Sequence, residues 1–286
     1  MSTTQLKDEL RDPPELDSPL KPPGTAGTLV GILRSDLRFN RRTPLIWGGS
    51  LGATCALVAA IWPSIADSIG RAMQGYPESI KKAFGIVTLS DVNQYVDAEM
   101  LSLILPLAMA YFAVRTATRS IVWAEEHHHL DTLLALPLSR RVLAWGSLSA
   151  TAFLVALILL ITWAMTYAAA AIVGAHPSGT TLGAGFANVW PISMAFAGFG
   201  VFLCGFAHRS GTVVGVASGT LVAMYVIDLV GKISPDLKPF RVVSAFRYYG
   251  SAIQNGLDWA HVAILTVTAI VLTIAGTEMF QRRDIL

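Results

Sequence analysis

Residues 142–175 read VLAWGSLSATAFLVALILLITWAMTYAAAAIVGA and contain no charged side chain. A helix needs about 20 apolar residues to cross a bilayer, so this stretch is long enough to cross one and to tilt or project beyond it. The whole composition agrees, because 53% of the 286 residues are hydrophobic and 14% are charged. Soluble domains typically have about 25% charged residues. With a mean hydropathy of +0.54, the chain is predicted to be a membrane protein.

Five further apolar runs lie on either side: residues 45–65, the segment between Glu99 and Arg115, and residues 185–207, 210–230 and 259–277. Glu99 and Arg115 bound a short run, so we expect both at the membrane interfaces, with the Arg115 side chain reaching toward water. Asp228 lies near the end of the run at 210–230, and we expect its carboxylate to reach water too. The pattern predicts an all-α membrane protein with six transmembrane helices in one domain, residues 28–286.

The chain begins with a polar region that differs from the rest. Residues 1–27 contain five prolines among mixed charges and no apolar core of a signal peptide, which predicts a disordered cytoplasmic tail. From 28 to 42, leucine and valine share one helical face while four arginines supply positive charge. Such a segment is typical of an amphipathic helix lying in the membrane interface, although a plain extension of the first span would differ little from it.

A charged segment, residues 124–141, immediately precedes the uncharged stretch and has the sequence AEEHHHLDTLLALPLSRR. Leu130 and Leu134 continue a helical stripe that starts at Trp123 and His127. Acidic residues lie early in the segment and two arginines follow its end, which is the charge order that a helix dipole favours. Pro137 cannot continue a helix interior and predicts a turn. A short amphipathic helix between two membrane spans is typical of a docking element, and we call residues 124–141 the docking segment.

The positive charges predict the orientation of the chain. With both termini in the cytoplasm, two thirds of the 21 lysine and arginine residues lie inside, as the positive-inside rule favours. The docking segment then faces the cytoplasm of a plasma (inner) membrane protein, and residues 66–98 and 232–258 face outward. Apolar residues at helical spacing in these outer segments, such as Phe246, Tyr249 and Ile253, predict short helices packed on the outer surface or dipping into it.

Glycines in two of the predicted spans have the four-residue spacing that allows helix backbones to approach closely. They are Gly48 and Gly52 in the first span, and Gly211, Gly215 and Gly219 in the fifth. Contacts within one subunit and contacts between subunits explain this spacing equally well.

The sequence lacks the motifs that several kinds of binding site and catalytic site require. Gly231-Lys232 is not a phosphate-binding loop, because the glycine required five residues earlier is replaced by Val226. His127, His128 and His129 are consecutive, so on a helix they diverge and cannot converge on one metal ion. Cys55 and Cys204 lie within apolar runs and indicate no disulfide framework. We expect no catalytic, cofactor-binding or metal-binding residue on this chain, and no nucleic-acid partner.

The docking segment resembles the pattern EE…G-T-L-E-L-L-L-x-x-P-x-S-R, which marks the cytoplasmic loop after the second span in six-helix permeases of exporter-class ABC transporters. The matching positions are Glu125, Glu126, Leu130, Asp131, Leu133, Leu134, Ala135, Pro137, Ser139 and Arg140. The run Ser244–Tyr249 resembles that family's S-P-F-x-Y-Y, and Arg282-Arg283-Asp284 resembles its usual ending. His129 stands where the family often has glycine, and Ala245 replaces the proline.

The resemblance implies a half-transporter. Its partners would be a second copy of the permease or a paralogue, the lipid bilayer, and separate ATPase subunits that bind ATP and Mg. The implied ATPase-docking residues, on a cytoplasmic coupling helix, are Glu125, Glu126, Leu130, Asp131, Leu133, Leu134, Pro137 and Arg140. The apolar spans favour an amphipathic or hydrophobic cargo, such as an antibiotic in multidrug efflux, a lipid or a peptide. A glycan exporter is the alternative within this class, and a self-powered carrier or an intramembrane enzyme is the alternative outside it.

Overall fold

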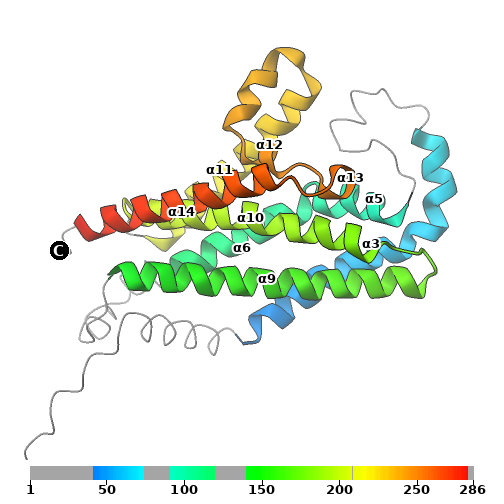
Figure 1. Ribbon diagram of the computed structural model, residues 1–286, viewed down its shortest axis with the longest axis horizontal. Helices are drawn as coiled ribbons and strands as arrows, with labels where there is room; N and C mark the ends of the chain where they lie inside the picture. The colour runs from blue at the N-terminus through cyan, green and yellow to red at the C-terminus, as the bar shows by residue number, and fades with distance from the viewer. Residues whose placement is uncertain (1–40, 74–90, 120–139, 208, 283–286) are drawn as a thin grey trace, which may run out of the picture.

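A computed structural model describes residues 41–73, 91–119, 140–207 and 209–282 (Figure 1). Every regular element in these ranges is a helix, which confirms the predicted all-α class. In chain order the elements are α3 (Thr43–Met73), α5 (Val92–Val96), the π-helix η1 (Asp97–Leu101), α6 (Ile104–Thr118), α9 (Arg140–Ile172), α10 (Gly179–Cys204), α11 (Ser210–Ile233), the 3₁₀-helix η3 (Pro235–Val243), α12 (Ala245–Tyr249), α13 (Ala252–Asn255) and α14 (Trp259–Arg282).

The described ranges contain the predicted membrane spans. Five helices, namely α3, α9, α10, α11 and α14, are each long and apolar enough to cross a bilayer. A sixth span is present if Val92–Leu101 and Ile104–Thr118, which meet at an angle of 47°, are counted as one broken span. The six-helix prediction therefore agrees with the structure, with its second span bent.

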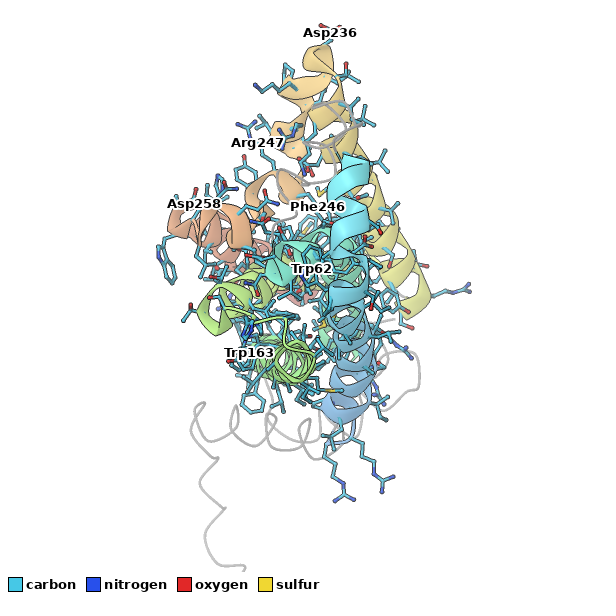
Figure 2. The ribbon with its side chains drawn as sticks, turned by 90° about the vertical axis from the view of Figure 1, so that its right-hand side faces the viewer. Trp62, Trp163, Asp236, Phe246, Arg247 and Asp258 are labelled. Atoms are coloured by element: carbon cyan, nitrogen blue, oxygen red, sulfur yellow. The ribbon has the colours of Figure 1, made fainter. Side chains whose placement is uncertain are left out.

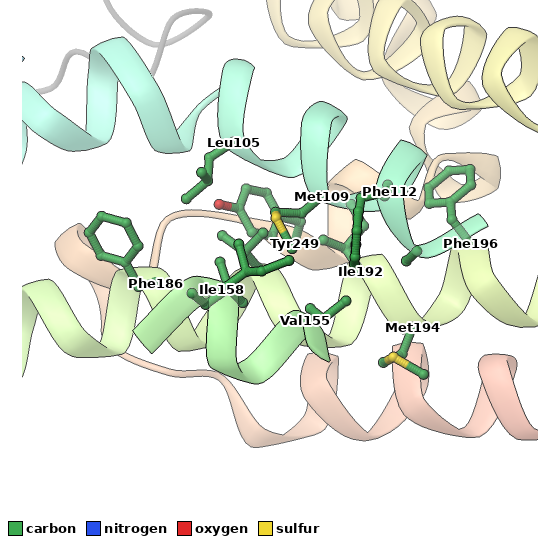
Figure 3. Packing of buried hydrophobic residues seen from close by; sticks show 14 of the residues in the cluster. Leu105, Met109, Phe112, Val155, Ile158, Phe186, Ile192, Met194, Phe196 and Tyr249 are labelled. Atoms are coloured by element: carbon green, nitrogen blue, oxygen red, sulfur yellow. The ribbon is translucent and has the colours of Figure 1, made fainter. Parts of the chain in front are cut away.

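Helix α10 forms the centre of the bundle. Within its apolar window 72% is buried, compared with 22% for α11 and 28% for α3, so α10 is the core helix and the other two are peripheral. Helices α6, α9 and α14 pack around α10, α3 packs on α9, and α11 packs on α6 and η3. Figure 3 shows the interior between them, where Met109, Ile158 and Ile192 are fully buried. A helix that is apolar all round is expected to be buried in this way.

The two ends of the bundle differ. We call the end that carries α5, η1, η3, α12 and α13 the loop end, and the opposite end, where α9 begins and α14 finishes, the terminal end. At the loop end, α11 and η3 extend away from the other helices, with Asp236 near the tip (Figures 1 and 2). The short helices predicted for residues 232–258 are present there as η3, α12 and α13, and Phe246, Tyr249 and Ile253 are buried against the bundle.

Several predicted segments lie outside the described residues. They are the tail at 1–27, the interfacial segment at 28–42 apart from Arg41 and Arg42, much of the outer segment at 66–98, and the docking segment up to Ser139. Arg140, the last of the ATPase-docking residues, is the first residue of α9.

The helical structure of the second span extends back past Glu99 to Val92 through η1, and the chain bends between Leu101 and Ile104. The expectation for a charged residue near the end of the fifth span is wrong. Asp228 does not reach water. It is 2% exposed and bonds to Arg241 and Lys232, because η3 folds back over the end of α11 and supplies the arginine.

Candidate functional site

The second span is broken at the point where a proline removes a helical hydrogen bond. Pro106 has no N–H for the carbonyl of Ser102, and a proline ring also crowds the carbonyl four residues before it. The Ser102 N–H bonds five residues back, to the Asp97 carbonyl over 2.8 Å, which is the wider spacing of a π-helix, and Leu103 leaves helical geometry with φ −141°. Such π-turns in membrane helices need other partners for the carbonyl groups that the break leaves free.

Tyr249, in α12, supplies one of those partners. Its hydroxyl donates to the Leu101 carbonyl over 2.8 Å, joining residues 148 positions apart in the sequence. Asn188 of α10 holds the same helix from the other side, because its side-chain amide donates to the Tyr249 carbonyl over 2.6 Å. Burial raises the pKa of Tyr249 well above its usual value, and the charge of Asp97 adds to this effect. The hydroxyl therefore stays protonated and remains a donor.

Asp97 makes a second connection between the broken span and the loop end. Its side chain is 6% exposed and accepts from the Ser251 hydroxyl over 2.5 Å and from the Gln254 amide over 3.3 Å. Asn93, one helical turn before it, is also buried, and its Oδ1 has no hydrogen-bond partner among the described residues. The carboxylate therefore ties η1 to α13. We call Asp97, Leu101, Asn188, Tyr249, Ser251 and Gln254 the loop-end junction.

The sequence around α12 and α13 favours these two short helices. The Ser244 hydroxyl caps α12 at the Phe246 N–H, and the Ser251 hydroxyl caps α13 at the Gln254 N–H. Gly250 follows α12 with φ +54°, a conformation that glycine adopts at little cost. In α10, Gly185 leaves room for the side chain of Ile253, because a Cβ there would lie 2.7 Å from it. The junction is thus closed by packing as well as by hydrogen bonds.

A buried ion cluster fastens η3 to α11 beside the junction. Asp228 accepts from Arg241 over 2.9 Å and lies 2.8 Å from the ammonium group of Lys232. A Cβ at Gly231 would collide with the Arg241 side chain, so glycine is what allows this approach. The Ser244 hydroxyl donates to the Met224 carbonyl over 2.6 Å and adds a further link. Together these contacts hold η3 against the end of α11.

The glycines singled out in the sequence have two different surroundings. In α3, a Cβ at Gly48 would lie 3.0 Å from Ile161, and one at Gly52 would lie 2.6 Å from Met165, so both approach α9 within the chain. In α11, Gly211, Gly215 and Gly219 have no described atom of the chain within 4 Å of a Cβ position. This face of α11 is open in the single chain.

Sequence reasoning missed the glycines that bring helix backbones closest together. A Cβ at Gly198 of α10 would lie 2.5 Å from the carbonyl oxygen of Ala269 in α14. A Cβ at Gly276 of α14 would lie 2.6 Å from the Cα of Phe202 in α10. Neither glycine has another glycine four residues away on its own helix, so the spacing rule does not find them. The junction residues Asp97 and Asn188 were missed as well, because their partners come from distant segments.

The terminal end carries one ion pair where the docking segment joins the bundle. Arg141, in the first turn of α9, lies 2.5 Å from Glu278 near the end of α14. Both side chains are about half exposed, so the pair is worth only about 0.2–1 kcal/mol. It nevertheless places the start of α9 beside the end of α14. Within the described ranges, no three His, Cys, Asp or Glu side chains are placed to hold a metal ion.

The bent second span is held by contacts from α12 and α13 at one end of the helix bundle. The family model for the C-terminal domain of the multidrug efflux system permease Rv1217c matches residues 31–281. The chain belongs to this family. No curated protein matches the chain. The protein is thus a multi-pass membrane permease, and the loop-end junction joins its bent second span to α10, α12 and α13.

Proposed function

We propose that this permease is the transmembrane half of an ATP-driven exporter of the ABC class, coupled to ATPase subunits on separate chains. The family match supports a permease of multidrug efflux. The ATP coupling rests on the docking segment, whose sequence resembles the ATPase-contacting loop of ABC exporters.

One observation supports the coupling most directly. Helix α9 begins at Arg140, where the docking segment ends, and Arg141 contacts Glu278 in α14. A force applied to the docking segment would therefore act on the start of α9 and the end of α14 together. Helix α14 contacts α10 by backbone atoms at Gly198 and Gly276, so the displacement would pass into the core of the bundle rather than into a single peripheral helix.

A second permease completes the proposed path. The open face of α11 presents Gly211, Gly215 and Gly219 beside exposed valines such as Val222 and Val226. Small residues let helices approach closely in a bilayer. We propose that a second copy or a paralogue packs on this face. The cargo, an amphipathic or hydrophobic molecule, would then pass along the interface between the two permeases. A glycan is the alternative cargo.

The orientation follows from the positive charges. The terminal end would face the cytoplasm with both chain termini, and the loop end would face outward, because two thirds of the 21 lysine and arginine residues then lie inside. The ATPase would bind from the cytoplasm with its ATP and Mg, and the loop-end junction would close the outer end of the path.

The proposal is tested at the docking segment. Replacing Leu133 and Leu134 together by aspartate would bury unpaired charge in the ATPase contact, and burial of a single leucine is worth about 1.5–3 kcal/mol. We expect the double variant to insert normally, yet to lose the ATPase on co-purification and to lose cargo-stimulated ATP hydrolysis. His128→Asp, on a different face of the same predicted helix, is the control and should retain the ATPase.

Undiminished recovery of the ATPase with the double variant would overturn the docking assignment. Efflux that continues in cells while no ATPase co-purifies with the wild-type permease would point instead to a self-powered carrier.

A further inference from the structure

A cavity of about 560 Å³ lies in the loop-end half of the bundle, between α9, α10 and the start of α14. Helix α14 packs mainly on α10, whereas α9 packs on both α3 and α10, and α9 and α14 contact each other much less, which leaves a cleft beside α10. Its wall includes Leu159 and Trp163 from α9, Phe186 and Trp190 from α10, and Trp259 and Val262 from α14. No charged residue lines the cavity among the described residues.

The cavity opens on the outside of the bundle and not toward the interior. Trp259 and Leu160 line it and are 74% and 55% exposed. The surfaces around it belong to helices that are apolar enough to cross a bilayer. The open face of α11 does not contribute to the lining, so the cavity is separate from the path proposed between two permeases. From helices of this composition we expect the open side to face hydrocarbon, and the medium that reaches it is then lipid.

The aromatic residues fix the depth of the cavity mouth. Trp163 stacks on Tyr167, with 6.0 Å between ring centroids, in the last third of α9. Trp259 begins α14, directly after the charged side chain of Asp258. Tryptophan and tyrosine concentrate at the level where the hydrocarbon meets the polar headgroups. Figure 2 labels Trp163, in α9, and Asp258, which immediately precedes α14. We therefore expect the mouth at the ester level of the bilayer, with the rest of the cavity extending into the hydrocarbon.

The wall near the mouth also carries a hydrogen-bond donor. The indole N–H of Trp163 is buried against Gly183, 3.5 Å from the position of a Cβ, and has no acceptor among the described residues. Trp190, deeper in the wall, differs because its indole donates to the Ala152 carbonyl over 3.0 Å. A buried donor without a partner costs about 1–3 kcal/mol, so an acceptor that reaches Trp163 is favoured.

We propose that this cavity binds one acyl chain of a glycerophospholipid, with the ester carbonyl near Trp163 and the chain running along Leu159 and Trp190 toward the middle of the bilayer. The uncharged wall excludes the headgroup, which remains at the mouth beside Asp258 and His261. The bound chain fills the cleft between α9 and α14 and so supports the contact of both helices with α10. This role does not depend on ATP coupling or on the cargo.

Photolabelling tests the proposal. The full permease is reconstituted in vesicles of phosphatidylethanolamine and phosphatidylglycerol that contain a trace of phosphatidylglycerol with a diazirine on one acyl chain. After irradiation and digestion, we expect labelled peptides from residues 156–163 and 183–191. Ala156→Phe and Gly183→Phe place a ring into the cavity and should each reduce this labelling about tenfold, which corresponds to about 1.4 kcal/mol. Trp163→Phe keeps most of the shape and removes the donor, and should reduce labelling severalfold.

Ala263→Phe is the matched control, since Ala263 is exposed on α14 and does not line the cavity. It should label as the wild type does. Size-exclusion profiles identify any variant that fails to fold, and Trp163→Phe keeps the test valid if the larger substitutions do so. Equal labelling of the cavity-filling variants and the control would overturn the proposal. Displacement of the label by a stoichiometric amount of ethidium would also overturn it, because the cavity would then be a cargo site.

Discussion

Replacing Tyr249 by phenylalanine removes one hydroxyl from the loop-end junction and leaves the ring in place. The Leu101 carbonyl then loses the donor that lies 2.8 Å away, in surroundings where Leu101 is 1% exposed. A buried acceptor left without a partner costs about 1–3 kcal/mol. At 1.4 kcal/mol for each factor of ten, opening of the junction should become roughly 5 to 150 times more frequent.

Hydrogen–deuterium exchange measures that opening. Exchange of protected amides reports local opening, so the peptide that covers residues 245–255 should exchange faster in Tyr249→Phe by the same factor. The start of α9, at the other end of the bundle, should exchange as in the wild type. Tyr248→Phe is a matched control, because the Tyr248 hydroxyl is exposed and its bond to Val242 is long, at 3.4 Å. If both variants exchange at the wild-type rate, the hydroxyl does not hold the junction closed and the reasoning is refuted.

The other predictions concern topology, helix contacts and the ion cluster. A cysteine introduced at Asn255 should react with an impermeant thiol reagent in intact cells and one at Ser139 should not, whereas the opposite pattern would invert the proposed orientation. Gly198→Ala should lower the unfolding temperature, because its methyl group meets the α14 backbone, while Gly215→Ala should not. Gly215→Leu should weaken dimers on native electrophoresis, and an unchanged dimer content would remove α11 as the contact. Arg241→Leu should destabilise the permease by about 2 kcal/mol or more, since it leaves a buried carboxylate with one partner fewer; unchanged thermal stability would contradict this.

The sequence was sufficient for the features that depend on composition and periodicity. Uncharged runs located the spans, and the one covering residues 142–175 corresponds closely to α9. Apolar spacing at Phe246, Tyr249 and Ile253 predicted the short helices at the loop end. These features are local, because each depends on residues within a few turns of one another.

The features that sequence reasoning missed depend on partners far along the chain. Pro106 removes a helical hydrogen bond locally, but the bend before it is held by Tyr249, which lies more than 140 residues further along the chain. Asp228 near a helix end predicted contact with water, and only the fold of η3 brings Arg241 to it. The four-residue spacing of glycines pointed to Gly211, Gly215 and Gly219. The close backbone contacts instead lie at Gly198 and Gly276, and neither of these has another glycine four residues away on its own helix.

The contacts of α10 with α14 fix the register and the separation of these two helices. Gly198 faces Ala269 and Gly205 faces Met279, so the two helices run parallel and touch over the half of their length nearer the terminal end. A slide of one residue, about 1.5 Å, would drive a side chain into a neighbouring backbone. Spin labels at exposed Thr180 on α10 and Val271 on α14 should therefore keep one separation throughout a transport cycle. The distance between labels at Thr180 and at Ile61, on the peripheral helix α3, can be compared with that constant distance. A change in the distance from Thr180 to Ile61 then reports a movement of α3.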